Sequence, residues 1–249
     1  MPKTVPLTRG PLLTEGTTKR LYETAQPDAA ILEFTDRPTA CQPSAPAVPG
    51  KGAWNAKISA RLFQLLESKG VNTHFEAVVS EAELLVKRLN MIPLAVVIRN
   101  RAAGRLAKRL GLEPGSALAN PVVELRYRSA ALEDPWVNES HVLALRLATE
   151  EELKVIRERS SSILAVLTKF FQERDLDLID LTLEFGRFRG RVVLGDELSP
   201  DTIRLWERGV PLPTDADLFL QRDLRGTRQA YQEVGRRVLE TAWASSKKP

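Results

Sequence analysis

The sequence predicts an α+β protein, because strand-like and helix-like stretches dominate different parts of the chain. Strand patterns prevail in the first hundred residues, and helical patterns prevail in the remainder. Within the remainder, residues 176–206 read as a hairpin, in which polar and apolar residues alternate from Asp180 to Phe185. A chain of 249 residues can bury a substantial core, as one large domain or as two lobes with a cleft between them.

The first hundred residues begin with two predicted short strands within residues 12–24, joined by a turn that contains Gly16. A third short strand is expected at residues 31–34. A glycine turn lets backbone N–H groups approach a phosphate, and Lys19 just beyond it adds charge. An ordinary hairpin turn explains the same residues, and on this pattern alone it is the more common case.

Residues 36–50 are rich in proline and predict an extended loop, which is followed by a helix from Lys51 to about Gly70. Two apolar runs then occupy residues 84–99 and break at residues 91–93. The second run is β-branched and continuous, which is typical of a strand covered on both faces. We expect the connection between lobes near Met91 and Pro93.

A short basic helix is predicted at residues 102–110, followed by loops and short strands up to residue 148. The motif at residues 149–152 is a capping box that opens the longest helix. Helical spacing predicts its buried stripe to be Leu153, Ile156, Ser160, Ile163, Leu164, Leu167, Phe170 and Phe171. A further helix is expected over residues 215–243, with a stripe of Tyr231, Val234, Val238 and Leu239.

The hairpin at 176–206 carries the sharpest chemical hypothesis. A turn centred on Gly190 would place Glu184 opposite Asp196 on one face of the sheet. Opposed carboxylates repel each other, and hard oxygen ligands suit Mg²⁺ that carries a nucleotide phosphate. The alternative is a solvated acidic pair balanced by nearby arginines, and the spacing by itself favours that alternative.

Composition excludes several classes of function. The net charge of +4 comes from 36 basic and 32 acidic residues without a dense basic block, which favours a small phosphorylated ligand over nucleic acid. The single cysteine, Cys41, excludes an internal disulfide, and His74 and His141 are too far apart in sequence to suggest zinc. No apolar run approaches membrane-spanning length, so we expect a cytoplasmic protein with no membrane partner.

Seven stretches, taken in order, closely resemble the SAICAR synthetase family, formally phosphoribosylaminoimidazole-succinocarboxamide synthase. No single stretch is diagnostic, but the ordered set is specific and covers nearly the whole chain. The stretches are EG-TTKRLY (15–22), LEFTDRPTA (32–40), PGKGAWNAKIS (49–59), LLVKRLNMIPLAVVIRNRAAG (84–104), DPWVNESH (134–141), LEFG (183–186) and LGDELSPDTIRLW (194–206).

The resemblance implies an ATP-dependent ligase of purine biosynthesis. It would join L-aspartate to the carboxylate of carboxyaminoimidazole ribonucleotide through an acyl phosphate, using ATP and Mg²⁺. It also implies a homodimer, with an antiparallel-sheet nucleotide-binding lobe at residues 1–93, a mixed α/β lobe with the substrate and Mg²⁺ sites at residues 94–249, and an ATP cleft between them. Phosphoryl transfer of this kind needs a metal, cationic clamps and positioning rather than a protein nucleophile.

The resemblance also implies roles for individual residues. The catalytic set is Glu184, Asp196 and Lys19, of which Glu184 and Asp196 would bind the metal. The nucleotide would contact Gly16, Lys19, Lys87, Met91 and Glu184. The substrates would contact Asp36, Arg99, Arg105, Asp180, Ser199 and Arg204, with Asp201 nearby.

Three positions depart from the family pattern: Thr17 and Thr182 each replace a lysine, and Arg105 replaces a serine. We hypothesise that Arg105 supplies the cation lost at residue 182. The departures leave open a divergent ligase that joins a related acid or amine. A nucleotide-binding protein without catalysis is a third possibility, which the retained acidic pair disfavours.

Overall fold

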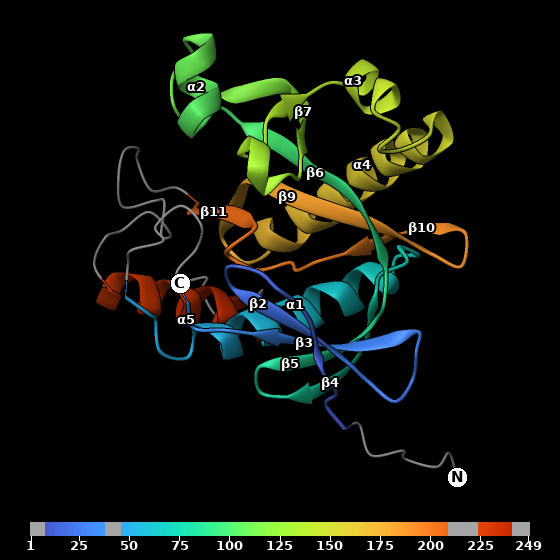
Figure 1. The fold of residues 1–249 in the computed structure, drawn as a ribbon. Helices are drawn as coiled ribbons and strands as arrows, with labels where there is room; N and C mark the ends of the chain where they lie inside the picture. The colour runs from blue at the N-terminus through green and yellow to red at the C-terminus, as the bar shows by residue number, and fades with distance from the viewer. Residues whose placement is uncertain (1–7, 38–45, 209–223, 241–249) are drawn as a thin grey trace.

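The computed structural model describes residues 8–37, 46–208 and 224–240, and within these ranges the chain builds two antiparallel sheets flanked by helices (Figure 1). The first sheet has the strand order β1-β2-β3-β5-β4. Its strands are β1 (Leu12–Glu15), β2 (Lys19–Glu23), β3 (Ala29–Phe34), β4 (Phe75–Ser80) and β5 (Glu83–Lys87).

The second sheet has the order β10-β9-β6-β7-β8, and β11 also pairs with β9. The long strand β9 pairs with β6 along one edge, whereas β11 and β10 share its other edge. The strands are β6 (Asn90–Arg101), β7 (Ala117–Tyr127), β8 (Trp136–Val137), β9 (Leu176–Phe188), β10 (Arg191–Gly195) and β11 (Ile203–Glu207).

Helices cover the apolar side of each sheet. Helix α1 packs against β3, β4 and β5, α5 packs against α1, and α4 packs against β6, β9 and β10. The helices are α1 (Lys51–Glu67), α2 (Gly104–Leu110), α3 (Glu139–Ala144), α4 (Glu150–Gln172) and α5 (Leu224–Leu239), with a short 3-10 turn at Ala130–Leu132. Among the described helices, none has the length and apolar character needed to cross a bilayer.

The α+β class is confirmed, and so are most of the predicted elements. The capping box of α4 forms between Thr149 and Glu152 as expected. All eight predicted stripe residues of α4 are buried: Leu153, Ile156, Ser160, Ile163, Leu164, Leu167, Phe170 and Phe171. The predicted last helix is observed as α5, and the parts of that prediction before residue 224 and after residue 240 lie outside the described residues.

Several local predictions are wrong. Residues 91–93 do not interrupt the structure, because β6 already begins at Asn90 and the break falls at residues 88–89. Pro93 is tolerated inside the strand because the pairing with β9 is irregular between Met91 and Ala95, so no ladder N–H is needed there. Strand β7 is much longer than the short strand expected, and α3 was not predicted. Leu239, which was expected in the buried stripe of the last helix, is exposed.

The register of the predicted hairpin is wrong by one residue. The turn uses Arg189 and Gly190, both with positive φ (48° and 75°), so that Phe188 pairs with Arg191. A two-residue turn with both φ values positive is the common hairpin solution, and glycine is needed at only one of its positions here. Glu184 therefore pairs with Gly195, and Asp196 follows directly after the end of β10.

Residues 72–74 connect the two sheets by backbone hydrogen bonds. Thr73 bridges to Leu194 of β10, and the backbone N–H of His74 donates to the Leu194 carbonyl at 2.8 Å. On the other side, the N–H of Lys87 in β5 donates to the His74 carbonyl at 2.7 Å. The end of β5 and the end of β10 are thus held at a fixed spacing.

Candidate functional site

The side of the second sheet that faces away from α4 is polar. Along β9, Leu181, Leu183 and Phe185 belong to the hydrophobic core, whereas Asp180 and Glu184 take the opposite parity. Their partners in β6 and β7 complete this polar face: Ala95 and Arg126 lie in the row of Glu184, Val97 and Glu124 in the row of Thr182, and Arg99 beside Asp180. Thr182 and Val97 therefore separate Glu184, at one end of this face, from Asp180 and Arg99 at the other.

Lys19 joins the first sheet to this region. The residue begins β2, directly after the Gly16 turn, where the Gly16 N–H donates to the Lys19 carbonyl at 2.9 Å. Its Nζ atom lies 2.5 Å from Oδ1 of Asp196 and 2.6 Å from Oε1 of Glu197. Burial works to lower the pKa of the Lys19 ammonium, but the two carboxylates outweigh burial and raise the pKa above its ordinary value.

Asp196 has a left-handed backbone, with φ 59°, which sets the direction in which its side chain leaves β10. Burial works to raise the pKa of the Asp196 carboxyl, yet the charge and hydrogen bond of Lys19 bring that pKa below its usual value. Asp196 is therefore an anion at neutral pH, held by one lysine that it shares with Glu197.

The pKa of Glu184 is shifted in the opposite direction to that of Asp196. Burial, followed by the neighbouring charge of Asp196, raises the pKa of Glu184 to about 7, although Arg128 and Lys19 oppose the rise. Arg128 lies beyond the end of β7, and its Nε is 3.1 Å from Oε1 of Glu184. The backbone N–H of Arg128 donates to the Pro93 carbonyl at 2.9 Å, which fixes the arginine beside the start of β6.

The donor set fits a magnesium nucleotide better than a metal held by the protein alone. No group of three or more His, Cys, Asp or Glu side chains converges on one point within the described residues. Mg²⁺ commonly takes one or two carboxylates and completes its octahedron with phosphate oxygens and water. Glu184 and Asp196 are two carboxylates whose charges already interact, and they could offer hard oxygen ligands to such an ion.

A second charged group lies at the other end of the polar face. Arg99 donates from Nε to Glu124 at 3.0 Å and from Nη1 to Asp180 at 2.9 Å. Arg204 of β11 approaches the same Asp180 oxygen at 3.6 Å. A Cβ atom at Gly104 would come within 3.2 Å of the Arg204 guanidinium, so the start of α2 is close to this pair. Two guanidinium groups at one point suit a phosphate or a carboxylate.

Arg105 follows Gly104 as the next residue of α2, and its side chain is exposed. Thr182 lies one row from Asp180 on the polar face, where it pairs with Val97. The hypothesis that Arg105 replaces a cation at position 182 therefore stays a prediction.

The loop from Asp196 to Thr202 is anchored at its far end by a buried lysine. Lys51, the first residue of α1, places Nζ 2.7 Å from Oδ2 of Asp201. Asn55 donates to the same oxygen at 3.0 Å, and the Tyr231 hydroxyl of α5 donates to the other oxygen. Ser199 is fully buried within this loop, where its hydroxyl donates to Glu197 and accepts from the Asp201 N–H.

The remaining predicted residues divide between the site and the scaffold. Lys87 Nζ donates to the Thr73 carbonyl at 2.9 Å, and the exposed Met91 lies beside Gly195, where an added Cβ would approach its sulfur at 3.4 Å. Asp36 has a structural task at the start of α1: its two oxygens accept the N–H groups of Gly50 and Gly52, each at 2.9 Å. His74 is buried, and burial lowers its pKa to about 4.

Sequence reasoning missed several residues that the structure places in these clusters, among them Glu197, Arg128 and Lys51. Glu197 follows Asp196 directly in the sequence, and this neighbourhood could have marked it as a candidate site residue. Arg128 and Lys51 reach the site only through tertiary structure.

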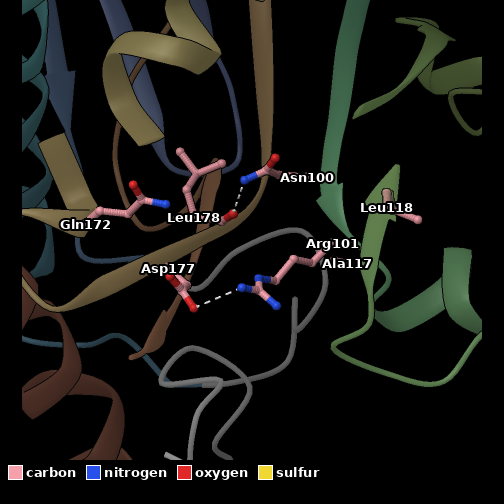
Figure 2. Close-up of a pocket in the computed structure, with 7 residues that line it drawn as sticks. All are labelled: Asn100, Arg101, Ala117, Leu118, Gln172, Asp177 and Leu178. Carbon is pink, nitrogen blue, oxygen red and sulfur yellow. Dashed lines mark hydrogen bonds and ion pairs between the residues drawn. The ribbon is translucent and has the colours of Figure 1, made fainter. Parts of the chain in front are cut away.

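A pocket of about 190 Å³ lies outside these clusters, at the C-terminal end of α4 (Figure 2). Its polar groups are largely paired with each other: Arg101 forms an ion pair with Asp177 at 3.4 Å, and Asn100 donates to the Leu178 carbonyl at 2.9 Å. None of the predicted site residues lines this pocket.

Comparisons with known proteins agree on one family. The family model described as SAICAR synthetase matches residues 12–238. The chain is 46% identical over 230 residues to phosphoribosylaminoimidazole-succinocarboxamide synthase of Chlorobium limicola, covering 92% of this chain and 97% of the relative. It is 44% identical over 229 residues to the enzyme of the same name from Coprothermobacter proteolyticus, covering 91% of this chain and 97% of the relative.

Solved structures give the same result. The chain superposes on a SAICAR synthetase in complex with ADP with a TM-score of 0.84 and 37% identity, covering 92% of this chain and 97% of the other. It superposes on the synthase from Ehrlichia chaffeensis with a TM-score of 0.85 and 33% identity, covering 92% and 98%.

Proposed function

This chain belongs to the SAICAR synthetase family, and we propose that it is the ATP-dependent ligase that joins L-aspartate to carboxyaminoimidazole ribonucleotide in de novo purine biosynthesis. The products are SAICAR, ADP and phosphate. A neighbour of known structure binds ADP, which supports the use of ATP. The observation that carries the proposal is the convergence of Lys19, Asp196 and Glu197 beside Glu184, opposite an arginine pair on the same polar face.

The two ends of the polar face suit the two halves of the reaction. Lys19, Glu184 and Asp196 would face the phosphates of ATP, close to the glycine turn. Arg99 and Arg204 would hold the anionic ribonucleotide, because a guanidinium binds phosphate and carboxylate oxygens in pairs. Bound Mg²⁺, held by Glu184 and Asp196, would supply charge neutralisation on the transferring phosphoryl group.

The chemistry requires activation of the substrate carboxylate. Its oxygen attacks the γ-phosphorus of ATP, the bond to ADP breaks, and an acyl phosphate forms. The amine of L-aspartate then attacks the acyl carbon, and phosphate leaves as the amide forms. The protein contributes orientation and cationic charge, and no covalent protein intermediate is needed.

Finer features of the proposal rest on the family resemblance. We propose that Mg²⁺ is the metal, that the enzyme is a cytoplasmic homodimer, and that residues 1–93 and 94–249 act as nucleotide and substrate lobes. The site roles of Gly16, Lys87, Met91, Ser199 and Asp180 belong to the same proposal.

The proposal is tested by incubating the purified protein with ATP, Mg²⁺, L-aspartate and carboxyaminoimidazole ribonucleotide. ADP release that depends on aspartate, together with the amide product, is the expected result. ADP release only with a related carboxylate or amine would identify a divergent ligase. Nucleotide binding without ligation of any acid would contradict the assignment as an enzyme.

A further inference from the structure

Lys19 holds two carboxylates at almost the same distance, but their surroundings differ. The Asp196 side chain is 22% exposed, whereas that of Glu197 is 2% exposed. Asp196 lies at the end of β10 toward Glu184, with which its charge interacts. One partner of the ammonium is thus accessible to a ligand, and the other is buried behind it.

Glu197 is fixed by the loop that carries it. Its second oxygen accepts the Ser199 hydroxyl, and its carbonyl accepts the Thr202 hydroxyl at 3.2 Å. The next residue, Leu198, exchanges two hydrogen bonds with the Ser59 hydroxyl of α1, at 3.1 and 3.3 Å. The Glu197 carboxylate therefore cannot turn toward a ligand without breaking buried hydrogen bonds.

We propose that Glu197 is a positioning residue for the nucleotide, which keeps the Lys19 ammonium in place when Asp196 is drawn to Mg²⁺. This inference rests on the proposed function. A carboxylate that coordinates a divalent cation no longer neutralises a neighbouring lysine to the same degree. Without Glu197, Lys19 would then lack a buried counter-charge and would move away from the phosphate position.

A positioning role and a purely structural role of Glu197 predict different effects of Mg²⁺ on nucleotide binding. If Glu197 only stabilises the loop, its loss weakens nucleotide binding equally with and without Mg²⁺. If Glu197 holds Lys19 while Asp196 is engaged, its loss matters mainly when Mg²⁺ is present. Without the metal, Asp196 still holds the lysine.

The experiment is calorimetric titration of the full chain with ADP, in Mg²⁺ and in EDTA, for the wild type, Glu197→Gln, Lys19→Met and the double variant. In Mg²⁺ each single change should weaken ADP binding by about tenfold, and the double variant should bind no worse than Lys19→Met. In EDTA, Glu197→Gln should bind within about twofold of the wild type.

Two further variants serve as controls, one for specificity and one for folding. Glu152→Gln is the control, because Glu152 is also a glutamate in an ion pair, with Arg187 at 2.5 Å, yet it belongs to α4. It should leave ADP affinity unchanged. Glu197→Asp keeps the charge but withdraws the carboxylate, so it should fold and still weaken ADP binding in Mg²⁺.

Additive effects of Glu197→Gln and Lys19→Met, or equal losses in Mg²⁺ and in EDTA, would overturn the inference while leaving the proposed function intact. A wild-type chain that binds no ADP under either condition would instead overturn the proposed function, and the inference with it.

Discussion

Arg128 forms an ion pair with Glu184, with 3.1 Å between Nε of the arginine and Oε1 of the glutamate, and its Nη1 also donates to Asp134. The carboxylate that we propose for the magnesium nucleotide therefore has a cationic partner from the end of β7. This partner opposes the burial and the Asp196 charge that together raise the pKa of Glu184 to about 7. The charge of Arg128 thus favours the ionised form of Glu184.

We predict that Arg128→Gln raises the pKa of Glu184 above that of the wild type. Metal ligation requires the ionised carboxylate, so Mg²⁺-dependent ADP binding should strengthen as pH rises through about 7 in the wild type. In the variant the midpoint should lie at higher pH. Titration of ADP affinity in Mg²⁺ across this range measures the midpoint, and Arg157→Gln on α4 is the control. An unchanged midpoint would show that Arg128 does not tune Glu184.

A second prediction concerns turnover. Glu184→Gln and Asp196→Asn should each abolish amide formation, because each removes one of two proposed metal ligands. Steady-state assays measure the loss, and circular dichroism shows whether the chain remains folded. Near-normal activity in either folded variant would refute the metal assignment.

A third prediction uses the pH dependence of stability. The folded pKa of Glu184, about 7, lies above its ordinary 4.5, so its stabilising contribution is complete below about 4.5 and is lost as pH rises through about 7. Glu184→Gln cannot ionise. Its free energy of unfolding should therefore exceed that of the wild type at pH 8 by roughly 1 to 3 kcal/mol, and the difference should shrink toward pH 4. Urea unfolding at several pH values measures it, and a difference independent of pH contradicts it.

The sequence predicted what depends on local periodicity. The alternation along β9 correctly placed Leu181 and Leu183 in the core, with Asp180 and Glu184 on the other face. The register failed because it depends on how many residues the turn uses, and Arg189 has a left-handed backbone, which its side chain does not signal.

Roles created by tertiary contacts could not be predicted in the same way. Arg128 is more than fifty positions from Glu184 in the sequence, and Lys51 meets Asp201 only because α1, α5 and the loop after β10 converge. Local composition gives no sign of such meetings. Family resemblance locates ligand-facing residues, but it does not reveal which charges are already paired within the chain.

A fourth prediction concerns Arg105. If this exposed residue supplies the cation missing at Thr182, Arg105→Ser should weaken the apparent affinity for carboxyaminoimidazole ribonucleotide, by about tenfold for one lost phosphate contact. The KM for this substrate measures the change. Lys108→Ser, an exposed basic residue of the same helix, is the matched control. An unchanged KM for Arg105→Ser would refute the compensation.

The last prediction concerns the ion pair between Lys51 and Asp201, whose side chains are 1% and 5% exposed. Within the described part of the chain, Lys51→Met leaves the buried side chain of Asp201 with the neutral donors Asn55 and Tyr231 alone. Loss of one partner from a buried pair typically destabilises a protein by about 3 to 5 kcal/mol. We therefore expect a large drop in the midpoint of urea unfolding.

The double variant Lys51→Met/Asp201→Asn discriminates between causes. It removes both charges, so it should be more stable than Lys51→Met alone if the unpaired carboxylate is the cause. If the two effects simply add, the pair does not act as a unit.

Because Asp201 and Glu197 both hydrogen-bond to Ser199, loosening this anchor should also weaken ADP binding in Mg²⁺ through displacement of Glu197 and Lys19. Unchanged ADP affinity in the folded Lys51→Met variant would show that the anchor and the nucleotide site are independent.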